Sequence, residues 1–67
     1  MNTQFITIDP EICSGTPVFA GTRVFIDTLF DYLEGGDSVA QFLDDFPTVT
    51  KTQVDGVLES ARVAVVS

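Results

Sequence analysis

The segment SVAQFLDDFPTVTKTQVDGVLESA, Ser38–Ala61, contains two helix starts separated by a proline. Ser38 and Thr50 are each followed three residues later by glutamine, which is the pattern of a capping box. Pro47 prevents a helix that begins after Ser38 from continuing into the next one. Apolar residues recur at helical spacing after both starts: Val39, Phe42, Leu43 and Phe46, then Val54, Val57, Leu58, Ala61 and Val65. The segment therefore predicts two amphipathic helices.

An earlier segment predicts another helix. Its apolar face consists of Ile26, Leu29, Phe30 and Leu33. Asp27 is its predicted N-terminal cap, and Gly35-Gly36 is its predicted end. None of the three helices can bury its apolar stripe alone, so they must share one core. The connection Phe46–Val49 has the length of the turn in a helix-turn-helix.

Residues 1–25 predict β-structure and turns. Phe5–Ile8 is β-branched and aromatic, and Asp9-Pro10 closes it. Two short apolar pieces, residues 17–19 and 23–25, flank Ala20-Gly21-Thr22, which predicts a small hairpin with Gly21 at a positive φ. The predicted fold is mostly α: a β-hairpin region at 1–25 followed by a three-helix helix-turn-helix bundle at 26–67, in a single domain 1–67.

Composition narrows the possible functions. Cys13 is the only cysteine and histidine is absent, which excludes an internal disulfide, a Cys/His zinc site and histidine-based catalysis. The net charge is −7, whereas a domain that binds nucleic acid by itself is expected to carry a positively charged surface. A 67-residue chain has a small core, and this one lacks a disulfide or a Cys/His metal site to stabilise it. Oligomerisation would supply the missing stability, and we expect a homodimer. No apolar run is long enough for a membrane span and no basic signal start is present, so we expect a cytoplasmic protein.

The stretch CSGTPVFAGTRVF, Cys13–Phe25, raises the question of a phosphate-binding loop. A Walker loop needs Gly-Lys-Ser/Thr at the start of a helix, whereas Thr22-Arg23 and further apolar residues follow Gly21 here. We therefore interpret the glycines as turn formers and the threonines as local partners of the backbone. Arg23 has two interpretations: a clamp between the hairpin and Asp9 or Glu11, or a contact to a partner or a phosphate. The same two interpretations, hairpin clamp or partner-binding stretch, apply to its neighbours Gly15, Pro17, Gly21 and Thr22.

Other polar residues carry weaker signals. Asp44-Asp45 is interpreted as a solvated helix end, since adjacent carboxylates diverge on a helix. We expect no catalytic residue, no metal and no cofactor. Lys51, Thr52 and Gln53 suit the start of a DNA-reading helix, but Asp55 and Glu59 would repel phosphates. Gly56 costs this helix about 1 kcal/mol relative to alanine, which a close-packed neighbour would explain.

Residues 6–62 resemble the small bacterial family known as domain of unknown function 433. Its most specific marks, Cys-x-Gly-x-Pro and Gly-Thr-Arg, stand at Cys13, Gly15, Pro17, Gly21, Thr22 and Arg23. The resemblance implies a homeodomain-like helix-turn-helix and a VapB-type antitoxin role. The implied partner is a small PIN-like ribonuclease toxin, which such an antitoxin blocks while it often represses its own operon.

The acidic charge favours toxin neutralisation over DNA binding, because an acidic protein can occupy the basic RNA path of a nuclease. The tail after Arg62, VAVVS, is expected to pack on a partner or on a second copy of the chain. The expected function is that of a non-enzymatic antitoxin-like binding protein. The alternatives are a DNA-binding transcriptional regulator and an orphan structural or assembly subunit.

Overall fold

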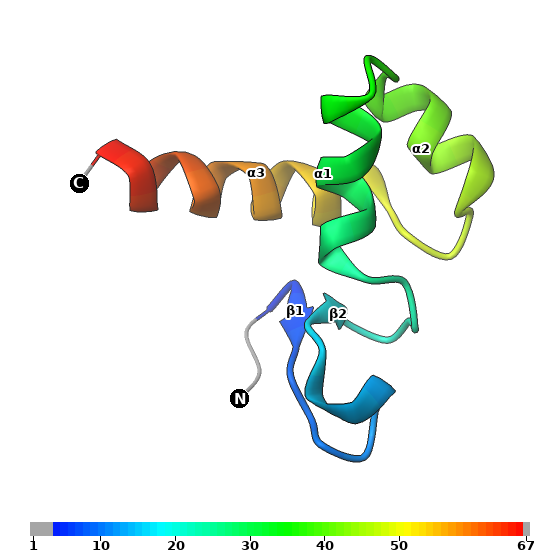
Figure 1. Ribbon diagram of the computed structural model, residues 1–67, viewed down its shortest axis with the longest axis vertical. Helices are drawn as coiled ribbons and strands as arrows, with labels where there is room; N and C mark the ends of the chain where they lie inside the picture. Colours follow the sequence, from blue (N-terminus) through cyan, green and yellow to red (C-terminus); the bar gives the residue numbers. More distant parts are fainter. Residues whose placement is uncertain (1–3, 67) are drawn as a thin grey trace.

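The chain folds into three α-helices preceded by a two-stranded antiparallel β-hairpin, the mostly helical architecture that the sequence predicts. The computed structural model describes residues 4–66, with side chains described through residue 63 (Figure 1). The elements are β1 (Ile6–Thr7), η1 (Cys13–Gly15), β2 (Val18–Phe19), α1 (Ile26–Glu34), α2 (Val39–Asp45) and α3 (Lys51–Val66).

The strand β2 pairs with β1, with Ile6 opposite Phe19 and Thr7 opposite Val18. The small hairpin that the sequence predicts around residues 20–22 is reduced to a single bridge between Val18 and Phe25. It holds two backbone hydrogen bonds, from the Phe19 N–H to the Val24 carbonyl and from the Ile26 N–H to the Pro17 carbonyl. A second strand cannot develop there because α1 begins immediately after the bridge.

The turn η1 between the two strands is left-handed. Cys13, Ser14 and Gly15 have φ values of 50°, 56° and 83°. A left-handed conformation costs a residue other than glycine about 1–2 kcal/mol. The hydrogen bonds from the Gly15 N–H to the Ile12 carbonyl and from the Thr16 N–H to the Cys13 carbonyl hold the turn closed.

The helix boundaries follow the sequence signals closely. The Ser38 hydroxyl accepts a hydrogen bond from the Gln41 N–H at the start of α2. At the start of α3 the predicted box is complete: the Thr50 N–H donates to Gln53 Oε1 and the Gln53 N–H donates to Thr50 Oγ1. The end of α1 is also as predicted, with Gly35 as its cap and Gly36 at a φ of 89°.

The predicted cap of α1 is wrong. The capping position is Phe25, which provides no side-chain hydrogen bond, and Asp27 lies inside the first turn. The Ile26 N–H already has the Pro17 carbonyl as its acceptor, so this helix needs less from a capping side chain. Asp27 still favours the helix start through its charge.

The core gathers side chains from β2, all three helices and the connection before α3. Its buried members are Phe19, Ile26, Leu29, Phe42, Val49, Val54 and Val57. Phe42 is the centre of an aromatic group, with ring centroids 5.8 Å from Phe19, 5.4 Å from Tyr32 and 5.1 Å from Phe46. Offset and edge contacts of this kind add to the free energy gained by burying the rings.

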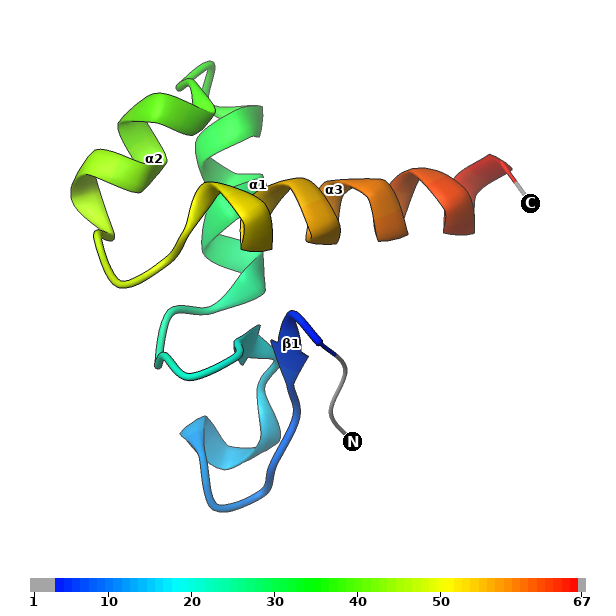
Figure 2. The ribbon, with the colours of Figure 1, turned by 180° about the vertical axis from the view of Figure 1, so that it is seen from behind.

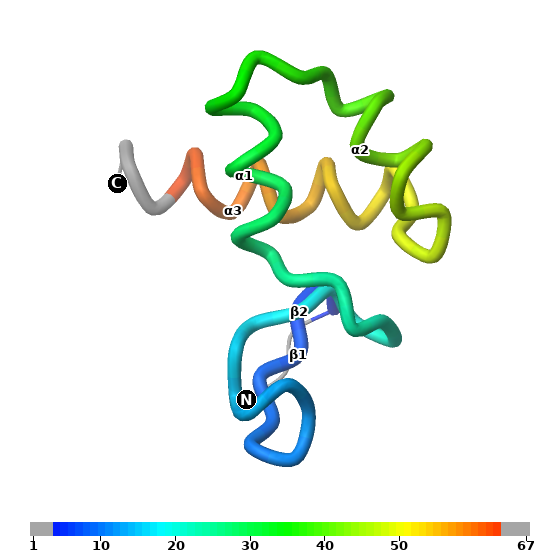
Figure 3. Tube along the Cα trace, turned by 45° about the vertical axis from the view of Figure 1, so that its right-hand side comes forward, coloured from blue at the N-terminus to red at the C-terminus, as the bar shows by residue number. Residues whose placement is uncertain are grey.

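Helix α3 crosses α1, and its C-terminal end extends away from the other elements (Figures 1 and 2). The tube in Figure 3 shows the same crossing from another side, with the hairpin near the start of α1. Val63, on the extended part, is 48% exposed. The predicted contacts of Val65 and Ser67 lie outside the described side chains. No helix in the described range 4–66 is long and apolar enough to cross a bilayer.

Gly56 illustrates how closely α3 meets the hairpin region. A Cβ atom placed on Gly56 would overlap the ring of Phe5, so the close-packed neighbour expected from the sequence is Phe5. The ring of Phe5 packs against the core while its carbonyl accepts the Ala20 N–H at 2.9 Å.

Substitution of Gly56 therefore has opposite effects in two backgrounds. Gly56→Ala in the native chain is expected to lower the free energy of unfolding by about 1–2 kcal/mol, because the ring must move out of its packing. In a Phe5→Ala background the same change is expected to raise it by about 0.5–1 kcal/mol, the gain in helix propensity. Urea unfolding of the four proteins measures both effects. Equal effects in the two backgrounds would contradict the contact.

Tyr32 links α1 to α2 through a hydrogen bond of 2.6 Å from its hydroxyl to Asp45 Oδ2. This hydrogen bond raises the pKa of Tyr32 above its ordinary value near 10. Because the folded-state pKa is the higher one, the contribution to stability is present below the unfolded-state pKa and is lost as the pH rises through the folded-state pKa.

Tyr32→Phe is accordingly expected to be less stable than the native chain at pH 7–9. The difference in the free energy of unfolding should shrink as the pH rises beyond about 10, where tyrosine ionises. Unfolding curves of both proteins between pH 7 and 11 measure it. A constant difference across this range would show that only the packing of the phenol oxygen matters.

Candidate functional site

The loop between β2 and α1 carries the Gly-Thr-Arg motif on a tight turn. The Thr22 N–H donates to the Phe19 carbonyl at 3.0 Å, and Gly21 at the third position has a φ of 76°. A turn of this shape favours glycine there, as the sequence predicts. Thr22 Oγ1 donates to the Phe19 carbonyl at 2.8 Å and accepts from the Val24 N–H at 3.1 Å. Thr22 is thus a local partner of the backbone.

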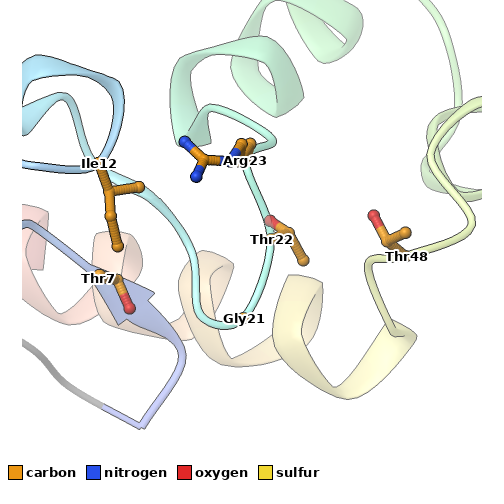
Figure 4. A pocket seen from close by; sticks show the side chains of 6 residues that line it. All are labelled: Thr7, Ile12, Gly21, Thr22, Arg23 and Thr48. Atoms are coloured by element: carbon orange, nitrogen blue, oxygen red, sulfur yellow. The ribbon is translucent and has the colours of Figure 1, made fainter.

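A pocket of about 340 Å³ opens beside this loop (Figure 4). It is lined by Thr7, Ile12, Gly21, Thr22, Arg23 and Thr48. The lining comes from β1, from the chain before η1, from the Gly-Thr-Arg loop and from the turn before α3. In that turn the Val49 N–H donates to the Phe46 carbonyl, with Pro47 at the second position and Thr48 at the third.

Arg23 does not form the predicted clamp. Its side chain is exposed, and among residues 4–66 it makes no ion pair with Asp9, Glu11 or another carboxylate. Asp9 instead closes its own turn: its Oδ1 accepts the Glu11 N–H and its carbonyl accepts the Ile12 N–H. Because these bonds are local, Asp9 is held to its own segment. The other interpretation of Arg23, a contact to a partner or an anion, stays a prediction.

Gly15 and Pro17, the remaining marks of the predicted partner-binding stretch, do not line the pocket. Gly15 provides the last left-handed residue of η1, and Pro17 gives its carbonyl to the Ile26 N–H at the start of α1. Both therefore have a visible role in shaping the chain around β2.

The residues predicted to read DNA occupy the first turn of α3. Lys51 is exposed and pairs with Asp55 at 2.8 Å, one helical turn away. Thr52 is exposed. The Gln53 amide nitrogen donates to the Ala20 carbonyl at 2.8 Å while its oxygen caps the helix. Gln53 thus joins α3 to the loop beside the pocket, and contact with a base would require this amide to leave its partners.

The carboxylates do not gather into a metal site. Among the described residues, no three potential ligands of the histidine, cysteine, aspartate or glutamate type lie together. Asp45 accepts hydrogen bonds from Tyr32 and from the Gln41 side chain, whereas the side chain of its neighbour Asp44, which is also exposed, has no hydrogen-bond or ion-pair partner among the described residues. Hydrogen bonding thus separates the roles of the two adjacent acids.

Sequence reasoning missed three lining residues, Thr7, Ile12 and Thr48. Thr48 stands twenty-five positions after Arg23, so only the tertiary fold brings the two to the same pocket. No local signal could have assigned them, because isolated threonine and isoleucine residues are common in strands and turns.

Gln53→Glu tests the link between α3 and the loop. Glutamate preserves the acceptor that caps Thr50 and is itself favoured in a capping box, so a purely local role predicts unchanged or higher stability. Loss of the donor to the Ala20 carbonyl instead predicts a free energy of unfolding lower by about 1–2 kcal/mol. Gln4→Glu, which adds the same charge at an exposed site, is the matched control in urea unfolding. A stable Gln53→Glu would show that the link contributes little.

Comparisons with known proteins give a single match. Searches of curated proteins and of solved structures found no significant relative. A scan against protein families matches residues 6–61 to the family described as "Protein of unknown function (DUF433)". That range includes both strands, α1, α2 and most of α3, together with every residue that lines the pocket. The chain therefore belongs to the DUF433 family.

Proposed function

We propose that this protein is a non-enzymatic antitoxin-like binding protein that neutralises a small PIN-like ribonuclease. The observation that carries the proposal is the distribution of its negative charge. Nine of the ten acidic side chains are exposed, all except Asp9. Among the described residues only Asp55 and Glu59 pair with a basic side chain.

Helix α1 presents the most ordered part of this charge. Asp27, Asp31 and Glu34 follow one another at spacings of four and three residues, and all three are exposed. Such spacing places them along one side of the helix, an arrangement called the acidic stripe below. Like charges at this spacing destabilise an isolated helix, and Glu34 also lies at the end where the helix dipole disfavours anions. The stripe is therefore poorly explained by helix stability alone.

A ribonuclease supplies the complementary surface. An enzyme that binds RNA neutralises phosphates with lysine and arginine side chains, so its RNA path is basic. An acidic stripe on a small rigid domain would associate with this path and exclude RNA by occupying it. The −7 charge of the chain would also speed the encounter at low salt.

The alternative of a DNA-binding helix-turn-helix has less support. Lys51 is paired with Asp55, and Gln53 is engaged by Thr50 and Ala20. Asp55 and Glu59 add negative charge to the exposed side of α3, where phosphates would have to approach. Autoregulation by DNA binding, and a homodimer, stay predictions from the sequence.

The test is inhibition of a purified PIN-like ribonuclease, chosen from the genomic neighbourhood of this protein's gene where one is encoded there. Asp27→Asn/Asp31→Asn should slow association with the nuclease by about tenfold at low salt, because it removes two of the three charges of the acidic stripe. The control, Glu11→Gln/Asp44→Asn, removes the same net charge from exposed sites outside α1 and should change the rate by about twofold or less. Circular dichroism verifies that both variants fold.

Two results would contradict the proposal. One is the absence of any complex with the nuclease at micromolar concentrations of both proteins. The other is an equal effect of the two double variants, which would show that net charge matters and the acidic stripe does not. Persistence of RNA cleavage in a formed complex would retain binding but remove the inhibitory role.

A further inference from the structure

The three basic residues of the chain differ in one respect. Lys51 pairs with Asp55 at 2.8 Å, and Arg62 pairs with Glu59 at 2.6 Å through its terminal nitrogen. Arg23 has no hydrogen-bond or ion-pair partner among residues 4–66, although the chain contains ten carboxylates. A guanidinium group carries five donors in a fixed fork, so an unmatched one leaves a strong binding capacity unused.

The unmatched guanidinium lines the pocket, and hydroxyl groups line it with Arg23. Thr7 and Thr48, which lie on opposite sides of the Gly21–Arg23 loop (Figure 4), have hydroxyls that donate to no described residue, whereas the Thr22 hydroxyl donates to the Phe19 carbonyl. No acidic side chain lines this pocket, in a chain where acids outnumber bases ten to three. The site therefore combines one cation and two available donors without a competing anion in its wall.

From this combination we infer that the pocket binds an oxyanion group, a carboxylate or a phosphate, with Arg23 as its principal ligand and either Thr7 or Thr48, on opposite sides of the Gly21–Arg23 loop, as an additional donor. The Arg fork matches the spacing of two oxygens on either group, and a hydroxyl donor adds one further hydrogen bond. Ile12 provides an apolar wall against the atoms that carry the oxyanion.

The site differs in design from a Walker loop. The Gly-Thr-Arg turn supplies Arg23 and Thr22. Thr48 comes from the turn before α3, and Thr7 comes from β1. Because the pocket is open and a single cation serves it, a small free anion should bind in the millimolar range. The same site would contribute more on a larger ligand or a protein partner, whose other contacts hold the group in place.

The experiment is a titration of the ¹⁵N-labelled full chain with sodium phosphate and, separately, with sodium acetate at pH 7. Ionic strength is held constant with sodium chloride in a cationic buffer. We expect saturable amide shifts at Thr7, Gly21, Thr22, Arg23 and Thr48 with at least one of the two anions. Tighter binding of phosphate assigns the natural ligand to a phosphate group, and equal or tighter binding of acetate assigns it to a carboxylate.

Two pairs of variants separate the site from general charge. Arg23→Gln should abolish the saturable shifts, whereas Arg62→Gln, which removes the same charge outside the pocket, should retain them. Either Thr7→Val or Thr48→Val should weaken binding by about threefold to tenfold, the loss of one hydrogen bond to a charged group, and so locate the oxyanion on one side of the loop. Thr52→Val removes an exposed hydroxyl outside the pocket and should leave the affinity unchanged.

Arg23 is exposed and its side chain makes no hydrogen bond or ion pair with a described residue, so Arg23→Gln is expected to fold like the native chain. The inference is overturned if neither anion produces shifts beyond those of chloride. It is also overturned if the shifts centre on Lys51 or Arg62, or if they persist in Arg23→Gln. None of these outcomes depends on the nuclease, so the test stands apart from that of the proposed function.

Discussion

The rest of the structure depends on the burial of Phe19 against Phe42. The Phe19 side chain is completely buried, and its ring lies 5.8 Å from the ring at the centre of the aromatic group. The backbone of the same residue shapes the loop, because its carbonyl accepts both the N–H and the hydroxyl of Thr22. One residue therefore fixes the core and the position of the Gly-Thr-Arg turn relative to it. In a chain of 67 residues this sharing matters, since a small core has little free energy to spare.

A second connection makes the loop and α3 depend on each other. Gln53 caps α3 with its side-chain oxygen and holds the Ala20 carbonyl with its side-chain nitrogen. The helix start and the loop are therefore ordered by one amide group. Thr48 stands in the turn just before this helix start, and Arg23 stands in the loop. The hydrogen bond from the Gln53 side chain to the Ala20 carbonyl therefore holds these two sides of the pocket together. The geometry of the site is a property of the fold more than of its motif.

The helices could be read from the sequence because their signals are local. Pro47, the serine and threonine caps and Gly35-Gly36 act within a few residues, and the structure places helix ends beside each of them. One local signal failed, the cap of α1, which Phe25 and not Asp27 occupies, and the other failures involve choices between distant partners. The sequence allowed the Asp9 carboxylate to accept from Arg23. In the structure it accepts instead from the N–H of Glu11, which is much closer along the chain. The left-handed turn at Cys13 and Ser14, and the approach of Thr7 and Thr48 to the loop, depend on how β1 and α3 pack, which periodicity does not report.

The pattern of pairing among the charges follows from the same division between local and distant contacts. Lys51 and Arg62 lie on a helix, where a carboxylate three or four residues away is within reach. Arg23 lies on a turn, where no helical neighbour is available, and Asp27 four residues later already belongs to α1. The loop therefore carries an unmatched cation three residues before the start of the helix that carries the acidic stripe. A partner that engaged both would need a basic surface beside an anionic group. Neutralising Arg23 and neutralising the acidic stripe should then weaken binding through separate contacts.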